Sequence, residues 1–391
     1  MVPAAIPAAH ALTTLEHGRN PHLMSGVSQQ TLDEAVQARK ARKERFCETS
    51  YIRFSDDWQR TPRGTAVFDG GTVYGYPSIG RILALEVGLR EQFDGPIWAE
   101  EKVDGYNVRV FRHGKETLAL TRGGFICPFT TDRLPDFLDL SLFDNHPDIV
   151  LCAEVAGPDN PYLEGCPPYV HDDVRFFVFD AMRLDTPGFL DQSEKLELMR
   201  RYRLPAVEIF GRFEPDSVDP IREILRDLNE SGREGLVFKR DVPDGKRAKY
   251  VTGASDIQDI RAMSDVLLEV PPEYFTNRLL RLALYLEEHG EYSGTELDRK
   301  VGAALLGGLR DAISGARREG RVIHSFRCRF NSRERAQQFI QQLKRMQGKQ
   351  VNVANAEINQ EGGYWVLTFE KIFQRMSETL AHHLEGGSQC D

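Results

Sequence analysis

The sequence lacks the motifs and runs that mark several common classes of protein. Its 391 residues contain no GxxxxGK(S/T) phosphate loop and no GxGxxG motif after a predicted strand, so we expect neither a P-loop site nor a Rossmann dinucleotide site. No run approaches the roughly 18 apolar residues that a membrane-spanning helix requires, so we predict no membrane partner. The amino terminus has no basic start and no long apolar core, so we expect no secretory signal and interpret residues 1–27 as a flexible tail.

Cysteine is also scarce, and its arrangement argues against metal binding and disulfide bonding. None of the cysteines forms a CxxC pair, and they are spread over the whole chain: Cys47, Cys127, Cys152, Cys166, Cys328 and Cys390. We therefore expect neither a structural zinc site nor a disulfide framework, and Cys390 in the polar last residues is expected to be free. This usage is typical of a protein of the reducing cytoplasm.

An excess of positive charge, which many nucleic-acid-binding proteins have, is absent. The formal net charge is −9 and the sequence pI is near 5.7. Net charge governs long-range attraction, but a local basic track can still hold a phosphate backbone. Three runs are candidates: residues 39–45, 200–203 and 321–335, the last with Phe326 and Phe330 interleaved. Basic residues beside aromatic rings suit single-stranded RNA, although a solvated helix face or a salt-bridged seam explains the first two runs equally well.

The composition that is present, 41 % hydrophobic and 28 % charged, is that of a globular α+β protein of two to four domains. Residues 28–95 form an N-terminal module that is predicted to open with a helix over 28–46. Short β-rich segments over 96–255 predict an antiparallel catalytic domain. Residues 256–318 have apolar side chains at intervals of three and four, which predicts helices. These helices would carry more leucine side chains than they can bury against one another. Residues 319–391 follow the order strand, helix, strand, strand, helix, which predicts a small α+β domain.

The run AEEKVDGYNVRVF, residues 99–111, places one lysine beside carboxylates and a turn glycine. A lysine amine attacks the α-phosphorus of a nucleotide only as the neutral base, and its ordinary pKa of about 10.4 leaves little of that form at neutral pH. Desolvation, nearby positive charge and a fixed orientation can supply the activation. Lys102 is the candidate nucleophile, Asp104 could hold a divalent metal or the ribose, and Gly105 allows a tight backbone.

Taken alone, KVDG also describes an ordinary hairpin edge, and the next residues predict a hairpin that turns at His113 and Gly114. Four further segments follow it: LCAEVAGPDNPY (151–162), VRFFVFDAMRLD (174–185), REGLVFKR (233–240) and KRAKYVTG (246–253). Each has a purely structural interpretation, because carboxylates can be solvated strand ends, aromatic residues can be core and lysines can be exposed charge. Their conjunction in this order is what favours a shared site.

In this order the segments resemble the motifs of the polynucleotide ligase and messenger-RNA capping superfamily. Within it, the chain looks most like the archaeal-type, homodimeric, ATP-dependent RNA ligases, the third RNA ligase family. The lysine motif ends in Asn107, where DNA ligases and capping enzymes usually have arginine, and GTVYGYPSIGRIL (71–83) resembles the Tyr-Pro segment of this family. The residues after 255 do not read as the five-strand barrel of those other enzymes. The resemblance implies an antiparallel-sheet nucleotidyltransferase domain with an N-terminal module, a helical dimerisation domain (256–318) and a small C-terminal α+β domain (319–391).

The resemblance also implies site residues. Lys102 would form the phosphoramide with AMP, Glu154 would accept a hydrogen bond from the ribose, and Phe179, or less readily Phe177, would stack on adenine. Further expected contacts to the nucleotide come from Asn107, Arg122, Lys239 and Lys249, the two lysines at the α-phosphate and Arg122 at the nucleotide or an RNA phosphate. Asp104, Glu154 and Glu234 would position magnesium, mainly through waters. One departure is Arg247, which stands where the family usually has lysine, and its role stays open.

The implied activity is an ATP-dependent RNA ligase that uses Mg²⁺ or Mn²⁺. It would join the 5′-phosphate and 3′-hydroxyl ends of single-stranded RNA through a lysyl-AMP and an RNA 5′-adenylate, with circularisation as one outcome. The resemblance implies a homodimer, and the cysteine pattern suggests the cytoplasm. Alternatives are a DNA ligase, an mRNA capping guanylyltransferase, and a non-catalytic RNA-binding relative.

Overall fold

The computed structural model describes residues 26–163, 165–242, 245–290, 294–346 and 351–388. Within these residues no helix is both long enough and apolar enough to cross a membrane. Most of the expected tail lies outside the described residues, as does Cys390, so both expectations stay predictions. The other five cysteines are free, in agreement with the absence of a disulfide framework.

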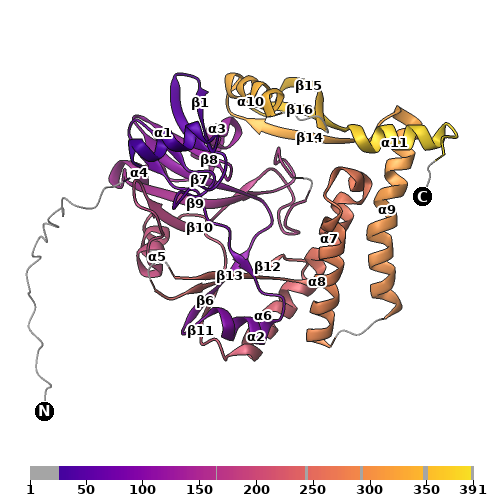
Figure 1. Ribbon diagram of the computed structural model, residues 1–391, viewed down its shortest axis with the longest axis horizontal. Helices are drawn as coiled ribbons and strands as arrows, with labels where there is room; N and C mark the ends of the chain where they lie inside the picture. The colour runs from indigo at the N-terminus through magenta and orange to yellow at the C-terminus, as the bar shows by residue number, and fades with distance from the viewer. Residues whose placement is uncertain (1–25, 164, 243–244, 291–293, 347–350, 389–391) are drawn as a thin grey trace, which may run out of the picture.

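Two sheets face each other at the centre of the molecule (Figure 1). The Lys102 sheet has the order β11-β6-β12-β13-β5, and the Glu154 sheet has the order β10-β9-β7-β8. The strands of the Lys102 sheet are β5 (Gly80–Arg81), β6 (Ile97–Lys102), β11 (Ile209–Phe213), β12 (Gly235–Arg240) and β13 (Arg247–Val251). Those of the Glu154 sheet are β7 (Tyr106–His113), β8 (Glu116–Thr121), β9 (Ile149–Ala156) and β10 (Arg175–Arg183). All pairs are antiparallel except β13 with β5, so the expected antiparallel α+β class is confirmed.

Burial explains why these strands form. Strand β9 is apolar at nearly every position and its side chains are buried on both faces, as expected for a strand in the middle of a two-layer unit. The hairpin predicted at His113 and Gly114 is confirmed, since β7 pairs with β8 and Gly114 has a φ of 58°. Helices α2 (Leu85–Gln92) and α6 (Val218–Glu230) cover the Lys102 sheet with leucines such as Leu89 and Leu225. Burial of each leucine side chain stabilises the fold by about 1.5–3 kcal/mol.

The N-terminal module differs from the prediction. Helix α1 (Gln29–Gln37) ends early, and the basic residues that follow it form strand β1 (Ala41–Phe46). This strand pairs with β2 (Thr49–Phe54), and the sheet continues through β3 (Ala66–Phe68) and β4 (Gly71–Val73). Arg39 adopts a left-handed φ of 60°, which ends the helix, and Ala41 and Phe54 pack against Leu32 of α1. The helix predicted over 28–46 was therefore wrong beyond residue 37, because pairing with β2 outweighs local helix propensity.

Three helices and a 3₁₀ turn follow the catalytic strands, as the apolar periodicity predicted. They are α7 (Gly253–Met263), η1 (Ser264–Glu269), α8 (Glu273–His289) and α9 (Thr295–Glu319). Helices α8 and α9 leave large leucines on the surface, at positions Leu279, Leu280, Leu284 and Leu306. Shorter helices α3 (Pro128–Phe137), α4 (Ser141–Asn145) and α5 (Gln192–Arg201) border the Glu154 sheet.

The C-terminal segment has the predicted order of strand, helix, strand, strand, helix. Its elements are β14 (Ile323–Phe330), α10 (Arg333–Met346), β15 (Val351–Glu361), β16 (Tyr364–Phe373) and α11 (Gln374–Leu384). Its apolar face shares one core with the Glu154 sheet, where the ring of Phe330 lies 5.3 Å from that of Phe129. Phe326 is also buried. Arg327 and Arg329 both pair with Asp159, which lies in the turn after β9. Much of the run 321–335 therefore serves packing and ion pairing, and its use as an RNA track stays a prediction.

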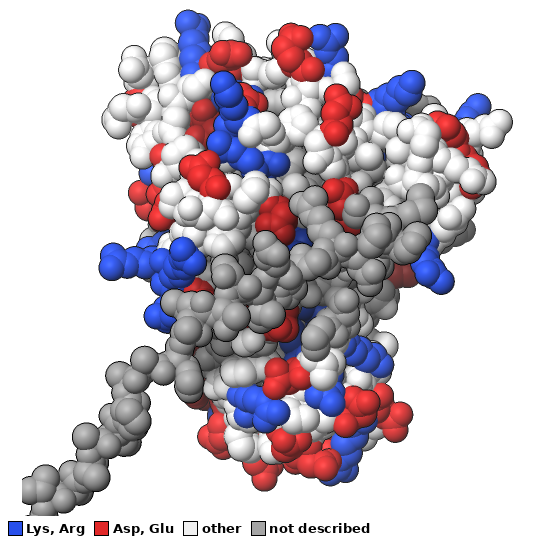
Figure 2. All heavy atoms as spheres, turned by 90° about the vertical axis from the view of Figure 1, so that its left-hand side faces the viewer, with Lys and Arg blue, Asp and Glu red and all other residues white. Residues whose placement is uncertain are grey.

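Acidic and basic side chains are interspersed on the face shown in Figure 2, and the visible side chains form no broad area of one sign. The visible part of this face therefore offers no extended basic surface to a polyanion.

Candidate active site

Lys102 is the last residue of β6, and strand pairing brings a carboxylate to it. Lys102 pairs in register with Gly235 at the start of β12, so Glu234, one residue earlier, reaches the amine. The Nζ atom of Lys102 lies 2.5 Å from Oε1 of Glu234. Lys249 comes from the next strand, β13, where it pairs with Val237 of β12. Three neighbouring strands thus deliver two lysines and a glutamate to one end of the Lys102 sheet.

The Glu154 sheet supplies the opposite wall. Glu154 on β9 pairs in register with Asn107 on β7. The turn between β6 and β7 lies directly on β9, since a Cβ on Gly105 would lie 2.6 Å from the carbonyl oxygen of Val155. That contact confirms why glycine is needed in the lysine motif. The same turn connects β6 of one sheet to β7 of the other.

The charges around Lys102 are strongly coupled. Burial opposes the charged amine, but the carboxylates of Glu234 and Glu154 outweigh burial and raise the pKa of Lys102. Burial, with Glu234 nearby, raises the pKa of Asp104 to about 7. Burial, opposed by Lys102, raises the pKa of Glu154 to about 8. The site therefore concentrates carboxylates that a cation would stabilise in their charged form.

Lys249 shows the opposite shift. Burial and the neighbouring charges of Lys102 and Arg81 lower the pKa of Lys249 to about 8. Arg81 lies on β5, where it pairs in parallel register with Lys249. The Nη1 atom of Arg81 is buried and has no hydrogen-bond partner among the described residues. We did not expect a role for Arg81 from the sequence, although it lies in the YPSIGR segment that precedes the nucleophile.

The two walls enclose a cavity of about 440 Å³. Seven of the residues expected to bind the nucleotide line it, namely Lys102, Asn107, Arg122, Glu154, Phe179, Lys239 and Lys249. Asp104 and Glu234 instead face a small recess that Lys102 also lines. Phe177 lines neither cavity, because its ring packs against Tyr169 at a centroid distance of 6.1 Å. Of the two expected stacking residues, only Phe179 thus borders the nucleotide-sized space.

Lys239 has partners that the sequence did not indicate. Its Nζ donates to Oε2 of Glu100 at 2.7 Å and to the carbonyl of Phe179 at 2.6 Å, and it pairs with Asp180 at 3.3 Å. These three acceptors occupy the ammonium hydrogens, so the expected α-phosphate contact would require Lys239 to leave a complete set of bonds. Arg247 pairs with the same Asp180 at 3.2 Å. The lysine-to-arginine departure therefore lies in a buried charge network behind the cavity.

The unsatisfied polar atoms indicate which groups the site could hold. Oδ1 of Asn107 and Oε2 of Glu234 are buried without a hydrogen-bond partner in the described structure. No three His, Cys, Asp or Glu side chains of the described residues are close enough to ligate one metal ion directly. The carboxylates fit a magnesium ion that keeps much of its water shell, and the lysines and Phe179 fit a nucleoside phosphate. This arrangement suits phosphoryl transfer, which depends on positioning and electrostatic stabilisation.

Comparisons with known proteins agree with this chemistry. The model of the RNA ligase family matches residues 95–251, and that of the Ligase Pab1020 C-terminal region matches residues 263–387. The chain is 48 % identical to a solved structure called a putative ATP-dependent DNA ligase from Aquifex aeolicus, with a TM-score of 0.89 over 93 % of this chain and 100 % of that one.

Two further relatives span nearly the same length. An archaeal ATP-dependent RNA ligase structure is 28 % identical, with a TM-score of 0.84 over 94 % of this chain and 98 % of that one. An uncharacterized protein of Methanocaldococcus jannaschii is 27 % identical over 91 % of this chain and 92 % of its own. The resemblance drawn from the motifs is thus supported along almost the whole chain.

Proposed function

The chain belongs to the archaeal-type ATP-dependent RNA ligase family and is an ATP-dependent ligase, and from this premise we propose that it seals single-stranded RNA through a lysyl-AMP on Lys102. The observation that supports the proposal most is the joint lining of one cavity of about 440 Å³ by Lys102, Glu154, Phe179 and Lys249. These side chains come from separate strands and combine a nucleophile, a ribose acceptor, a stacking ring and a phosphate cation.

In the first step, Nζ of Lys102 bonds to the α-phosphorus of ATP and pyrophosphate leaves. The amine must lose a proton, and Oε1 of Glu234, at 2.5 Å, is in position to take it. Lys249 lines the cavity and the charge of Arg81 acts on Lys249, so the two cations would offset the negative charge that develops on the phosphate oxygens. Asp104 and Glu234 would hold magnesium, mainly through waters. Its positive charge would offset the effect of these carboxylates on Lys102, and would so favour the neutral amine that attacks the phosphorus.

Two displacements complete the reaction. An oxygen of the RNA 5′-phosphate attacks the AMP phosphorus, and the lysine amine leaves and regains a proton. The 3′-hydroxyl of RNA then attacks the activated 5′-phosphate, AMP leaves, and a 3′ to 5′ phosphodiester forms. Both steps need the nucleotide to stay in the cavity that Phe179 and Lys102 line while the RNA ends align. Positioning should therefore supply most of the rate acceleration.

Covalent labelling tests the nucleophile. Incubation with α-labelled ATP and magnesium should leave acid-labile label on the denatured wild-type chain. Lys102→Arg, which keeps the charge and the length, should carry none because its guanidinium stays protonated. Label from GTP instead of ATP would favour a capping enzyme, and no label from either would favour a non-catalytic binding protein.

The name of the Aquifex aeolicus structure makes a DNA ligase the second candidate. Labelled 5′-phosphorylated single-stranded RNA, single-stranded DNA of the same sequence, and a nicked DNA duplex separate the two. The proposal requires sealing of the single-stranded RNA, including circles. Sealing of the nicked duplex alone would overturn the RNA assignment.

We also propose that residues 256–318 form a homodimer contact. Leu280 and Leu306 are each 58 % exposed on α8 and α9, more leucine surface than a monomer usually leaves in water. Sedimentation at micromolar concentration should show a dimer, and the Leu280→Glu, Leu306→Glu double variant should be a monomer. Leu384→Glu, which changes an exposed leucine on α11, is the matched control and should stay a dimer. A monomeric wild-type protein would refute the contact.

A further inference from the structure

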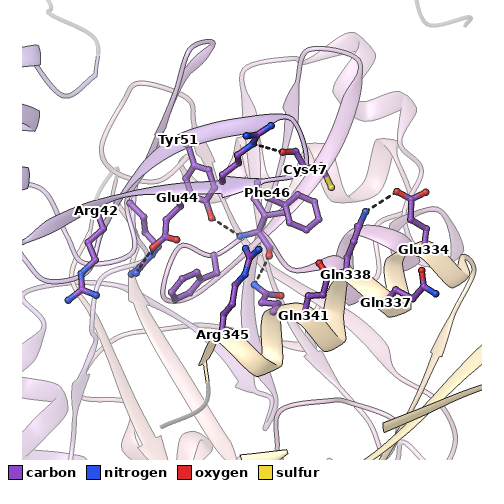
Figure 3. Close-up of a pocket in the computed structure, with 15 residues that line it drawn as sticks. Arg42, Glu44, Phe46, Cys47, Tyr51, Glu334, Gln337, Gln338, Gln341 and Arg345 are labelled. Carbon is purple, nitrogen blue, oxygen red and sulfur yellow. Dashed lines mark hydrogen bonds and ion pairs between the residues drawn. The ribbon is translucent and has the colours of Figure 1, made fainter.

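A second, larger cavity of about 990 Å³ lies between the β1–β2 hairpin and helix α10 (Figure 3). Figure 3 shows that the hairpin and the helix face each other across it, with Arg42, Glu44 and Phe46 on one side and Gln337, Gln341 and Arg345 on the other. We name this cavity the hairpin groove. Its lining residues are Arg42, Glu44, Arg45, Phe46, Cys47, Tyr51, Arg53, Phe125, Ile126, Glu334, Gln337, Gln338, Gln341, Gln342 and Arg345.

The hairpin groove is positively charged within an acidic protein. Four arginines line it against two glutamates, while the whole chain carries a net charge of −9. Glu44 is already paired with Arg53 at 2.9 Å, and Glu334 accepts a hydrogen bond from Gln338 at 3.0 Å. Arg42 and Arg345 are exposed, and neither side chain forms a hydrogen bond or ion pair with a described residue. The net positive charge is thus available to a ligand.

The groove also offers groups that suit nucleotide bases. Gln337, Gln338, Gln341 and Gln342 form one face of α10, and each amide carries both donors and an acceptor. A buried side-chain oxygen usually accepts a hydrogen bond. Oε1 of Gln342 is buried and has no hydrogen-bond partner in the described structure. The rings of Phe46 and Phe125 add flat apolar surfaces. Such a mixture of aromatic, amide and guanidinium groups suits unpaired bases and their phosphates.

The hairpin groove adjoins the nucleotide cavity. Phe125 lines both, and the guanidinium of Arg53 lies 3.8 Å from the centre of its ring and donates to the carbonyl of Gly123 at 3.3 Å. The next residue, Ile126, is held by both sides of the groove: its carbonyl accepts from Gln342 at 2.9 Å, and its N–H donates to Tyr51 at 3.3 Å. The two cavities therefore lie on either side of one wall residue, Phe125.

We propose that the hairpin groove binds the single-stranded RNA next to the end being joined, with arginines at the phosphates and the glutamine face at the bases. This inference rests on the RNA ligase function proposed above and deepens it, because it places the substrate on one surface. Arg42 and Arg345 are the phosphate contacts at its outer rim. Formation of the lysyl-AMP needs no RNA, so a defect confined to the groove separates RNA binding from adenylation.

The test compares two double variants that carry the same change in charge on the same two elements. Arg42→Glu with Arg345→Glu reverses the rim of the groove. Lys43→Glu with Lys344→Glu alters the exposed neighbours on β1 and α10, which do not line it. Fluorescence anisotropy measures the Kd for a labelled, 5′-phosphorylated single-stranded RNA of about 20 nucleotides, without ATP and with EDTA. Labelling with ATP and magnesium measures adenylation separately.

The arginine double variant should raise the Kd about ten-fold or more and flatten its dependence on salt, because two phosphate contacts become repulsive. The lysine double variant should stay within about two-fold of wild type, and both variants should form lysyl-AMP at the wild-type rate. Equal Kd values for the two double variants would overturn the inference, as would a loss of adenylation that parallels the loss of RNA binding. Displacement of the RNA by polyglutamate of equal charge would also overturn it, in favour of an acidic protein partner. If the wild type forms no lysyl-AMP, the proposed function fails instead.

Discussion

Replacing Gly105 by alanine tests how closely the two walls of the active site depend on one another. An added Cβ would lie 2.6 Å from the carbonyl oxygen of Val155, 2.8 Å from Cβ of Ala156 and 3.0 Å from Cγ of Glu154. Two of these atoms belong to the backbone or to a short, stiff side chain, so the conflict can be relieved only if β9 or the lysine turn moves by several tenths of an ångström. Overpacking of this kind costs about 1–3 kcal/mol.

The displacement should affect activity more than stability. Glu154 lies on β9 and Lys102 lies at the start of the lysine turn, so movement of either segment changes the separation of the two side chains. Because a misplacement near 1 Å can cost about 100-fold in rate, we expect Gly105→Ala to form lysyl-AMP about 100-fold more slowly while remaining folded. The initial rate of covalent labelling by α-labelled ATP measures the first effect, and urea unfolding measures the second.

Gly80→Ala is the matched control. Gly80 is also a strand glycine of the catalytic unit, but a Cβ there meets nothing within 4 Å and its φ lies outside the left-handed region. Its labelling rate should equal that of the wild type. If Gly105→Ala labels as fast as Gly80→Ala, the turn does not set the distance between the two walls and the reasoning is refuted.

Three further predictions concern the cavity and the network behind it. Arg81→Ala should slow lysyl-AMP formation about ten-fold, since its guanidinium acts on Lys249 and has one nitrogen without a partner among the described residues. An unchanged labelling rate would contradict a role in charge stabilisation. Phe179→Leu should raise the KM for ATP by about ten-fold through lost stacking, whereas Phe177→Leu should not, and equal effects in steady-state kinetics would contradict the assignment. Lys239 and other cations, acting against burial, lower the pKa of Asp180 to about 2. Its charge therefore stabilises the fold above about pH 4, and roughly 2 kcal/mol is lost as the pH falls toward 2, because the unfolded state then binds the proton first. When the free energy of unfolding is measured by chemical denaturation between about pH 5 and pH 2, the Asp180→Asn variant should lack this part of the loss. A pH dependence like that of the wild type would count against the linkage.

The sequence was sufficient where the relevant contacts are local or follow from strand order. Lys102, Glu154 and Lys249 lie in short motifs within strands, and in-register pairing brings them to one end of two sheets, so motif order predicted a shared site. The hairpin at Gly114 and the order of the C-terminal elements were likewise readable, because turn residues and apolar periodicity act over a few residues. The family and the α+β class followed from the same motifs.

Only the tertiary structure decided which charges are free and which are already paired. Lys239 looked like a phosphate ligand, but Glu100 and Asp180, far from it in sequence, take its hydrogens. The basic run 39–45 looked helical, yet pairing with β2 makes it a strand whose Arg42 faces α10. Ion pairs, burial and grooves depend on segments brought together by folding, and no local pattern of residues records those distances.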